Sequence, residues 1–187
     1  MTHSKINFAF LISLLFFSIT SCGKLDLQTT NPYNIYKFPL KNSFIALSPL
    51  PGRVDLESDL KMIEANGIIN VVTLVSNEEL TKYGVPTLLT RFENLNIEVL
   101  HSPIVDYGLP STEQMKSILT WIHKKVKAKE NILIHCVGGL GRSGTVMAIY
   151  AKAHLGKTGE DAIQYVRSIR GNDAVETTEQ QNFVIGW

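Results

Sequence analysis

The sequence has little cysteine and no excess of charge of either sign. Its 187 residues include two cysteines, which is too few for a disulfide scaffold. The 18 basic residues are nearly balanced by 17 acidic ones, for a net charge of +1. A protein that binds nucleic acid by counter-ion release normally carries a basic excess, so we expect no nucleic-acid partner. Internal repeats are lacking too, and 44% hydrophobic residues predict one folded domain with a substantial core.

A hydrophobic run lies near the N-terminus, at residues 8–19. Twelve residues are too few to span a bilayer but suit the hydrophobic region of a signal peptide. The run ends in Ile19-Thr-Ser-Cys22, which resembles the bacterial lipobox, whose cysteine is lipidated and becomes the mature N-terminus. We therefore expect residues 1–21 to be a signal peptide and Cys22 to anchor an exported lipoprotein to a membrane of the bacterial cell envelope. An uncleaved anchor or a plain secretory signal are the alternatives.

The rest of the chain divides into a predicted tether at 22–43, which has no sustained hydrophobic period, and a predicted domain at 44–187. In the domain, apolar β-branched runs alternate with amphipathic helical patterns. This alternation predicts an α/β fold with a mostly parallel central sheet flanked by helices on both sides. The expected strands are 44–47, 68–75, 97–101 and 131–135. The expected helices are 55–66, 77–83, 86–94, one opened by a capping box at Ser111–Gln114, 142–155 and 158–170.

A glycine-rich segment between a predicted strand and a predicted helix gives the strongest functional signal. It reads His135-Cys136-Val-Gly-Gly-Leu-Gly-Arg142-Ser143. Glycines permit a tight loop whose backbone N–H groups converge on one point, and the following helix directs its positive end there. The pattern therefore predicts a phosphate site in which the Arg142 guanidinium grips two oxygens. The expected phosphate-binding residues are Val137, Gly138, Gly139, Leu140, Gly141 and Arg142.

Cys136 is the predicted nucleophile of this site. The helix N-terminus, the loop amides and the guanidinium all favour an ionised thiolate, which can attack phosphorus and form a cysteinyl-phosphate. Ser143 is expected to hydrogen-bond the sulfur and stabilise it as a leaving group. His135 is expected to fix the loop rather than to transfer a proton. The alternative is a structural cysteine in a glycine-rich turn.

A leaving oxygen also needs a proton, and Asp106 is the predicted donor. It lies on a loop after an expected strand, thirty residues before Cys136. A loop carboxylic acid that reaches over the phosphate can serve as general acid and later as base for water. The alternative for a single loop aspartate is a solvated surface residue or a helix cap.

These residues resemble the signature of cysteine-dependent dual-specificity protein phosphatases, in which Asp106 falls at the position of the acid. Further segments resemble the kinase-associated phosphatase family (cyclin-dependent kinase inhibitor 3). They are 50–52, 79–89, 101–106, 138–143 and 169–177 through Gln180. The resemblance implies the dual-specificity phosphatase fold, activity on phosphotyrosine and on phosphoserine or phosphothreonine, and no metal or other cofactor. It also implies that Gln180 positions the hydrolytic water and that Arg170 supports the loop.

The substrate remains open at this stage. Our first hypothesis is a membrane-tethered phosphatase whose partner is a phosphorylated protein or peptide. An exported protein would not meet an intracellular kinase, so the substrate of the eukaryotic relatives is not carried over. The loop residues between Cys136 and Arg142 contain no lysine, which disfavours inositol phospholipids but leaves other non-protein phosphoesters open. A non-catalytic phosphopeptide-binding lipoprotein and a rhodanese-like sulfur carrier are rival hypotheses. If Cys22 is lipidated, Cys136 has no second thiol to protect it from oxidation.

Overall fold

The computed structural model describes residues 33–187. The predicted signal peptide and the predicted lipidation site Cys22 lie outside these residues. Within residues 33–187, no helix is both long enough and apolar enough to cross a bilayer.

The described residues form a five-stranded sheet in the order β1-β2-β5-β3-β4. Neighbouring strands run parallel except at the β1–β2 pair, which is antiparallel. β5 lies in the middle because its apolar residues are buried on both faces, as a central parallel strand requires. The strands are β1 (Tyr36–Pro39), β2 (Phe44–Ser48), β3 (Ile68–Thr73), β4 (Glu98–His101) and β5 (Asn131–His135).

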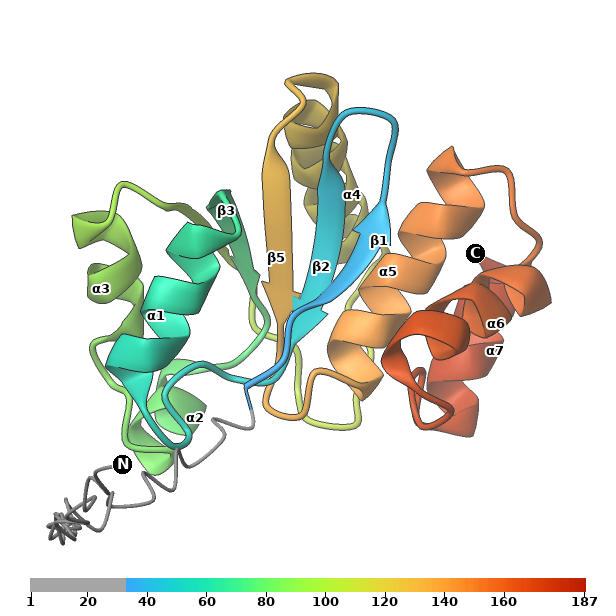
Figure 1. The fold of residues 1–187 in the computed structure, drawn as a ribbon. Helices are drawn as coiled ribbons and strands as arrows, with labels where there is room; N and C mark the ends of the chain where they lie inside the picture. The colour runs from blue at the N-terminus through green and yellow to red at the C-terminus, as the bar shows by residue number, and fades with distance from the viewer. Residues whose placement is uncertain (1–32) are drawn as a thin grey trace, which may run out of the picture. The chain divides into compact units, whose positions relative to one another are not determined.

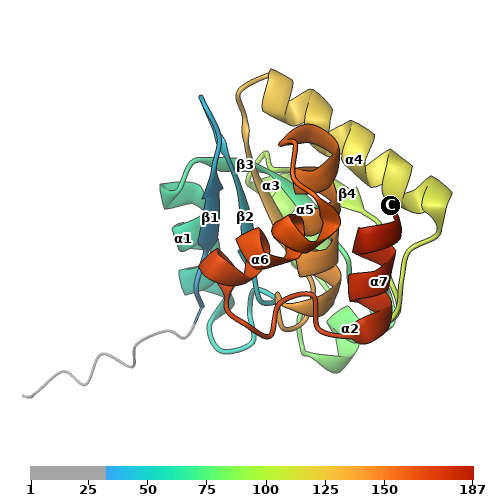
Figure 2. The same ribbon diagram turned by 90° about the vertical axis from the view of Figure 1, so that its right-hand side faces the viewer.

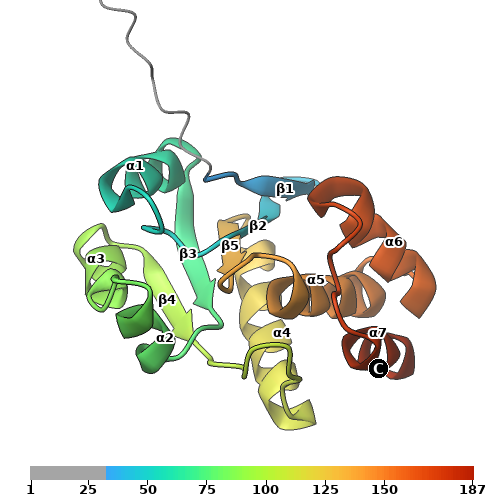
Figure 3. The ribbon, with the colours of Figure 1, turned by 90° about the horizontal axis from the view of Figure 1, so that it is seen from below.

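Helices cover both faces of this sheet, as predicted. Figures 1 and 3 show α1 and α3 on one side and α4, α5, α6 and α7 on the other. The helices are α1 (Leu56–Ala65), α2 (Asn77–Lys82), α3 (Leu88–Asn94), α4 (Thr112–Lys127), α5 (Gly141–His154), α6 (Gly159–Arg170) and α7 (Thr178–Gly186).

The helix α5 lies at the centre of the second layer. Every residue from Gly141 to Ala151 is buried, because α6 and α7 pack against α5 on the side away from the sheet (Figure 2). A helix that is buried all round carries no polar stripe, yet the first turn of α5 contains the buried polar residues Arg142, Ser143 and Thr145. These polar groups lie at the carboxyl ends of the parallel strands, where ligand sites of open α/β sheets occur.

Three expectations differ from the structure. Part of the predicted tether is a strand, since Tyr36–Pro39 pairs with β2; an edge strand of four residues is too short to show a hydrophobic period. The helix α7 was not predicted. The predicted capping box at Ser111–Gln114 is only half formed: Ser111 accepts a hydrogen bond from the Gln114 backbone, but the Gln114 side chain turns away to the loop after β4.

Candidate active site

The predicted phosphate loop, residues 136–141, joins the end of β5 to the start of α5. No side chain caps the N-terminus of α5. The backbone N–H groups of its first three residues, Gly141, Arg142 and Ser143, therefore have no intrahelical or capping partner, which is the condition under which a helix N-terminus binds an anion.

The loop carbonyls are held outward by protein donors. The Arg170 guanidinium donates to the Gly138 oxygen at 2.8 Å and to the Gly139 oxygen at 2.7 Å, and the Leu50 backbone donates to the Val137 oxygen at 3.0 Å. In a trans peptide the N–H points opposite to the C=O. The amides of Gly138, Gly139 and Leu140 are consequently directed to the other side of the loop, toward Cys136. The expected support from Arg170 is thus present, and its guanidinium also stacks over the ring of Tyr36 on β1, 4.3 Å from the ring centroid.

Gly139 is the position where the loop can tolerate no side chain. Its φ is +69°, in the left-handed region that favours glycine. A Cβ atom there would lie 2.4 Å from the backbone oxygen of Ser48, which belongs to β2 and cannot move away easily. The loop is therefore packed directly against the end of a neighbouring strand.

Cys136 lies almost fully buried beneath the loop. The Gly139 N–H donates to its Sγ at 3.2 Å, which matches the inward direction deduced from the carbonyls. The hydroxyl oxygen of Ser143 lies 3.5 Å from the same sulfur, within hydrogen-bonding distance. The sulfur thus has two hydrogen-bonding neighbours, the Gly139 amide and the Ser143 hydroxyl.

Arg142 joins several segments that are far apart in the sequence. Its Nη1 donates to the backbone oxygen of Ile104 at 2.9 Å and lies 2.9 and 3.0 Å from the two carboxylate oxygens of Glu79. Its Nη2 forms an ion pair with Asp106 Oδ1 at 2.9 Å, without the alignment of a hydrogen bond. Nε and Nη2 are buried and have no hydrogen-bond acceptor within residues 33–187. This edge of the guanidinium is therefore available to two oxygens of an anion.

Glu79 is a site residue whose role is not predictable from the sequence. It belongs to a complete capping box at the start of α2. The Glu79 carboxylate accepts a hydrogen bond from the Ser76 backbone N–H at 2.9 Å, and the Ser76 hydroxyl accepts one from the Glu79 backbone N–H. The Ser-x-x-Glu pattern is readable in the sequence. The partnership of Glu79 with Arg142, 63 positions away, is not.

Asp106 lies on the loop after β4, with its side chain 54% exposed. The next residue, Tyr107, has a φ of +59°, a left-handed conformation that a bulky residue adopts only where the surroundings enforce it. The Gln114 amide donates to the backbone oxygen of Pro103 at 2.8 Å and fastens this loop to α4. The predicted acid and the predicted phosphate-binding arginine are therefore in contact.

His135 is completely buried and bonded on both ring nitrogens. Nε2 lies 2.9 Å from the Thr73 hydroxyl and Nδ1 lies 3.3 Å from the Cys136 backbone oxygen. Burial lowers the pKa of His135 to about 4, and the positive charge of Arg142 contributes. The ring is thus neutral near pH 7, donating to Cys136 from Nδ1 and accepting from Thr73 at Nε2. This geometry fits the expectation that His135 fixes the loop.

The lowered pKa makes the stability of the fold pH-dependent. Because the pKa of His135 is below that of an unfolded histidine, its contribution is complete above pH ~6.5 and is lost as the pH falls toward 4. We expect this residue to cost roughly 2 kcal/mol of unfolding free energy between pH 7.5 and pH 5. Urea unfolding of the wild type and of His135→Gln at both pH values measures it. An equal pH dependence in the two proteins would contradict the assignment.

Gln180 is buried in the first turn of α7. Its Oε1 accepts from the backbone N–H groups of Glu176 and Thr177, completing a capping box, and its Nε2 lies 3.4 Å from the Gly108 oxygen. A Cβ atom at Gly141 would lie 3.0 Å from Oε1, so the amide sits directly behind the loop. Gln180 therefore joins α7 to the loop that carries Asp106, and its expected action on water stays a prediction.

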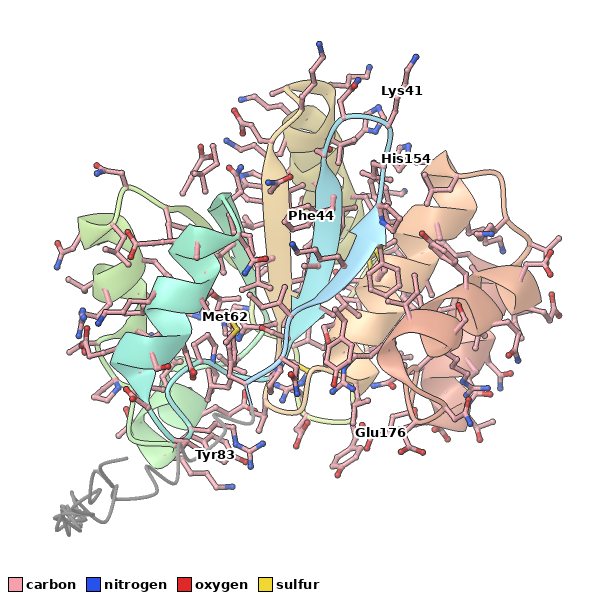
Figure 4. The ribbon with its side chains drawn as sticks, viewed as in Figure 1. Lys41, Phe44, Met62, Tyr83, His154 and Glu176 are labelled. Carbon is pink, nitrogen blue, oxygen red and sulfur yellow. The ribbon has the colours of Figure 1, made fainter. Side chains whose placement is uncertain are left out.

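These residues surround a pocket of about 190 Å³. Cys136 and Arg142 form its buried floor, while Asp106, Tyr107 and Glu176 are exposed at its rim. Figure 4 shows Tyr83, also a lining residue, and Glu176 at the same end of the molecule, with Lys41 and His154 at the opposite end. Within residues 33–187, no three His, Cys, Asp or Glu side chains are grouped so as to hold a metal ion.

A family model and curated proteins both match this chain over most of its length. A family model described as "Polymorphic toxin system, DSP-PTPase phosphatase" matches residues 49–160. Cyclin-dependent kinase inhibitor 3 of Rattus norvegicus is 33% identical over 172 residues, which cover 85% of this chain and 79% of that protein.

Solved structures show the same fold. Kinase associated phosphatase, in a form whose catalytic-site cysteine is replaced by serine, superimposes with a TM-score of 0.77 at 31% identity over 83% of this chain and 93% of its own. A mutant form of Tk-PTP gives a TM-score of 0.68 at 37% identity, over 80% of this chain and 91% of its own.

Proposed function

Because the chain belongs to the DSP-type protein tyrosine phosphatase family and is a phosphatase, we propose that it hydrolyses phosphotyrosine and phosphoserine or phosphothreonine esters of proteins through a cysteinyl-phosphate. One observation carries the proposal. The sulfur of Cys136 accepts a loop N–H, beside a guanidinium whose Nε and Nη2 have no acceptor among the described residues. A nucleophile and a receptor for two phosphate oxygens thus face the same pocket.

In the first step, the Cys136 thiolate attacks phosphorus and the ester P–O bond breaks. The loop amides and Arg142 bind the three non-bridging oxygens throughout, so their charge is balanced as it shifts in the transition state. Protonated Asp106 gives its proton to the leaving oxygen. The products of this step are the free alcohol or phenol and a cysteinyl-phosphate.

In the second step, water attacks the phosphorus of the cysteinyl-phosphate. Asp106, now a carboxylate, accepts a proton from the water, and the S–P bond breaks to release inorganic phosphate. The hydroxyl of Ser143, 3.5 Å from Sγ, donates to the departing thiolate. The cycle restores both the thiolate and the protonated acid.

The activity has a direct test. The purified full-length chain should hydrolyse p-nitrophenyl phosphate in the presence of a metal chelator, and orthovanadate should inhibit it by occupying the loop. No hydrolysis of any aryl phosphate would contradict the proposal and favour a non-catalytic phosphopeptide-binding protein. Asp106 argues for catalysis, because binding alone requires no acid.

Asp106→Asn should slow the enzyme according to the leaving group. Phenyl phosphate has a poor leaving group that needs the proton, so we expect a loss of about 10²-fold or more in kcat. p-Nitrophenyl phosphate needs the proton less and should lose less, which makes it the internal control. Equal losses on the two substrates would remove Asp106 as the general acid.

We also propose that Cys22 is lipidated and that the enzyme is anchored to a membrane of the bacterial cell envelope. The support is the sequence alone: a hydrophobic run that ends in Ile19-Thr-Ser-Cys22. A fatty-acid probe fed to cells should label the wild type and leave Cys22→Ala unlabelled. Equal labelling of the two proteins would end this proposal.

A further inference from the structure

Glu176 lies in the pocket but has no part in the two chemical steps. It belongs to the segment between α6 and α7 and lines the same pocket as Cys136. A Cβ atom at Gly141 would lie 2.7 Å from Glu176 Oε2. The carboxylate therefore rests against the last glycine of the phosphate loop, close to where a phosphorylated side chain must enter.

The negative charge of Glu176 is not neutralised by a partner. Within residues 33–187 it forms no ion pair, and the Arg142 guanidinium beside it is already paired with Glu79 and Asp106. Partial burial raises the pKa of Glu176, and the charges of Asp106 and Asp173 add to the effect, against the opposing influence of Arg142. The carboxylates of Asp106, Asp173 and Glu176 together make this side of the rim acidic.

The ring of Tyr107 lies at the same rim and is 60% exposed. Its left-handed backbone, with a φ of +59°, holds the side chain there at a conformational cost, which is typical of functional positions. An exposed aromatic face next to an unpaired carboxylate is the combination that binds an ammonium or guanidinium group.

A substrate that carries an anionic group in addition to its phosphate has no second cationic side chain to bind in the described part of the pocket. Arg142 is the one cationic residue among the described residues that line it, and its Nε and Nη2, which have no hydrogen-bond acceptor there, serve the phosphate. Lys82 lies in the adjoining hollow, which it shares with Tyr83 and Asp106. Positive charge is thus confined to the floor and to the hollow beside Tyr83.

We propose that Glu176 selects the substrate: with Tyr107 it binds a basic side chain next to the phosphorylated residue, and it repels phosphoesters that carry a second anionic group. The inference rests on the proposed phosphatase activity and names the substrate class of the same site. The preferred substrate is then a phosphoprotein segment with lysine or arginine beside the phosphorylated residue.

The test compares two phosphotyrosine peptides that differ only in the residues flanking phosphotyrosine, arginine in one and glutamate in the other. We expect the wild type to prefer the arginine peptide by about fivefold or more in kcat/KM, the effect of one ion pair at ~4 Å in water. The difference should lie mainly in KM, because the flanking charge binds the ground state and the transition state alike.

Three variants make the assignment specific. In Glu176→Gln, the ratio of kcat/KM for the arginine peptide to that for the glutamate peptide should be close to one. In Glu176→Lys, the glutamate peptide should be preferred. Glu179→Gln removes the same charge from an exposed position outside the pocket and should keep the wild-type preference. If Glu176→Gln also keeps the preference for the arginine peptide, or if the wild type shows no such preference, the inference is wrong.

Two further outcomes are informative. If Glu176→Gln also loses hydrolysis of p-nitrophenyl phosphate, Glu176 acts in the reaction itself and the selecting role is overturned. If the wild type hydrolyses a soluble inositol polyphosphate faster than the arginine peptide, the rim does not repel anions and the inference fails. A wild type that hydrolyses p-nitrophenyl phosphate without charge preference contradicts this inference alone, whereas one that hydrolyses nothing contradicts the phosphatase proposal.

Discussion

The variant Cys136→Ser should lose at least about 10⁴-fold in kcat, because removing the nucleophile removes the covalent route altogether. A serine hydroxyl is a far weaker nucleophile than a thiolate, and no base lies beside it: His135 is bonded on both nitrogens and its pKa is lowered to about 4. Steady-state hydrolysis of p-nitrophenyl phosphate measures the loss.

The same variant should still bind the anion. The Arg142 edge and the loop amides are independent of the sulfur, and serine is nearly isosteric with cysteine. Isothermal titration with tungstate should therefore give a Kd within about tenfold of the wild-type value, less than the contribution of one charged hydrogen bond. Measurable turnover by Cys136→Ser would refute the nucleophile, and loss of both turnover and tungstate binding would show that the loop itself had collapsed.

The variant Arg142→Lys should lose about 10²- to 10³-fold in kcat, the usual effect of removing a donor aimed at transition-state charge. Lysine keeps the positive charge but is a point donor without the planar fork. It cannot keep the contacts of Nη1 with Glu79 and Ile104 while also presenting two donors to the phosphate.

Two further variants test whether the orientation of the Arg142 guanidinium, and not only its positive charge, is needed for activity. Glu79→Gln leaves Arg142 intact but removes the carboxylate that orients it, and we expect a smaller loss of activity. Arg91→Lys makes the same substitution at an exposed ion pair with Glu57 and should change nothing measurable, as surface pairs contribute little. Full activity of Arg142→Lys would contradict the role of the fork.

The strand-loop-helix unit of the site could be predicted because its signals are local. A compact apolar strand, three closely spaced glycines and a helix pattern follow one another within about twenty-five residues, and the structure differs from the predicted bounds of β5 and α5 by no more than one residue.

The role of Glu79 could not be predicted, because it depends on contacts between distant segments. Glu79 orients Arg142 only because the ends of β3 and β4 bring α2 and the loop that carries Asp106 to the same place.

Two elements of the fold were not predicted either. The edge strand β1 has four residues and ends in Pro39, which is too short for a recognisable hydrophobic period. For α7 the sequence does contain a local signal, since Thr177-x-x-Gln180 is a capping box that marks the start of a helix.

The antiparallel course of β1 has a consequence for where the enzyme works. Because β1 runs against its neighbours, the described chain starts at the carboxyl ends of the parallel strands: the Tyr33 hydroxyl donates to Ser48, whose register partner, His135, directly precedes Cys136. Eleven peptide units separate Cys22 from Tyr33, a reach of at most about 40 Å. If Cys22 is lipidated, as proposed, Tyr33 lies no farther than that from the anchored residue, and we expect phosphoproteins at the membrane surface to be the substrates.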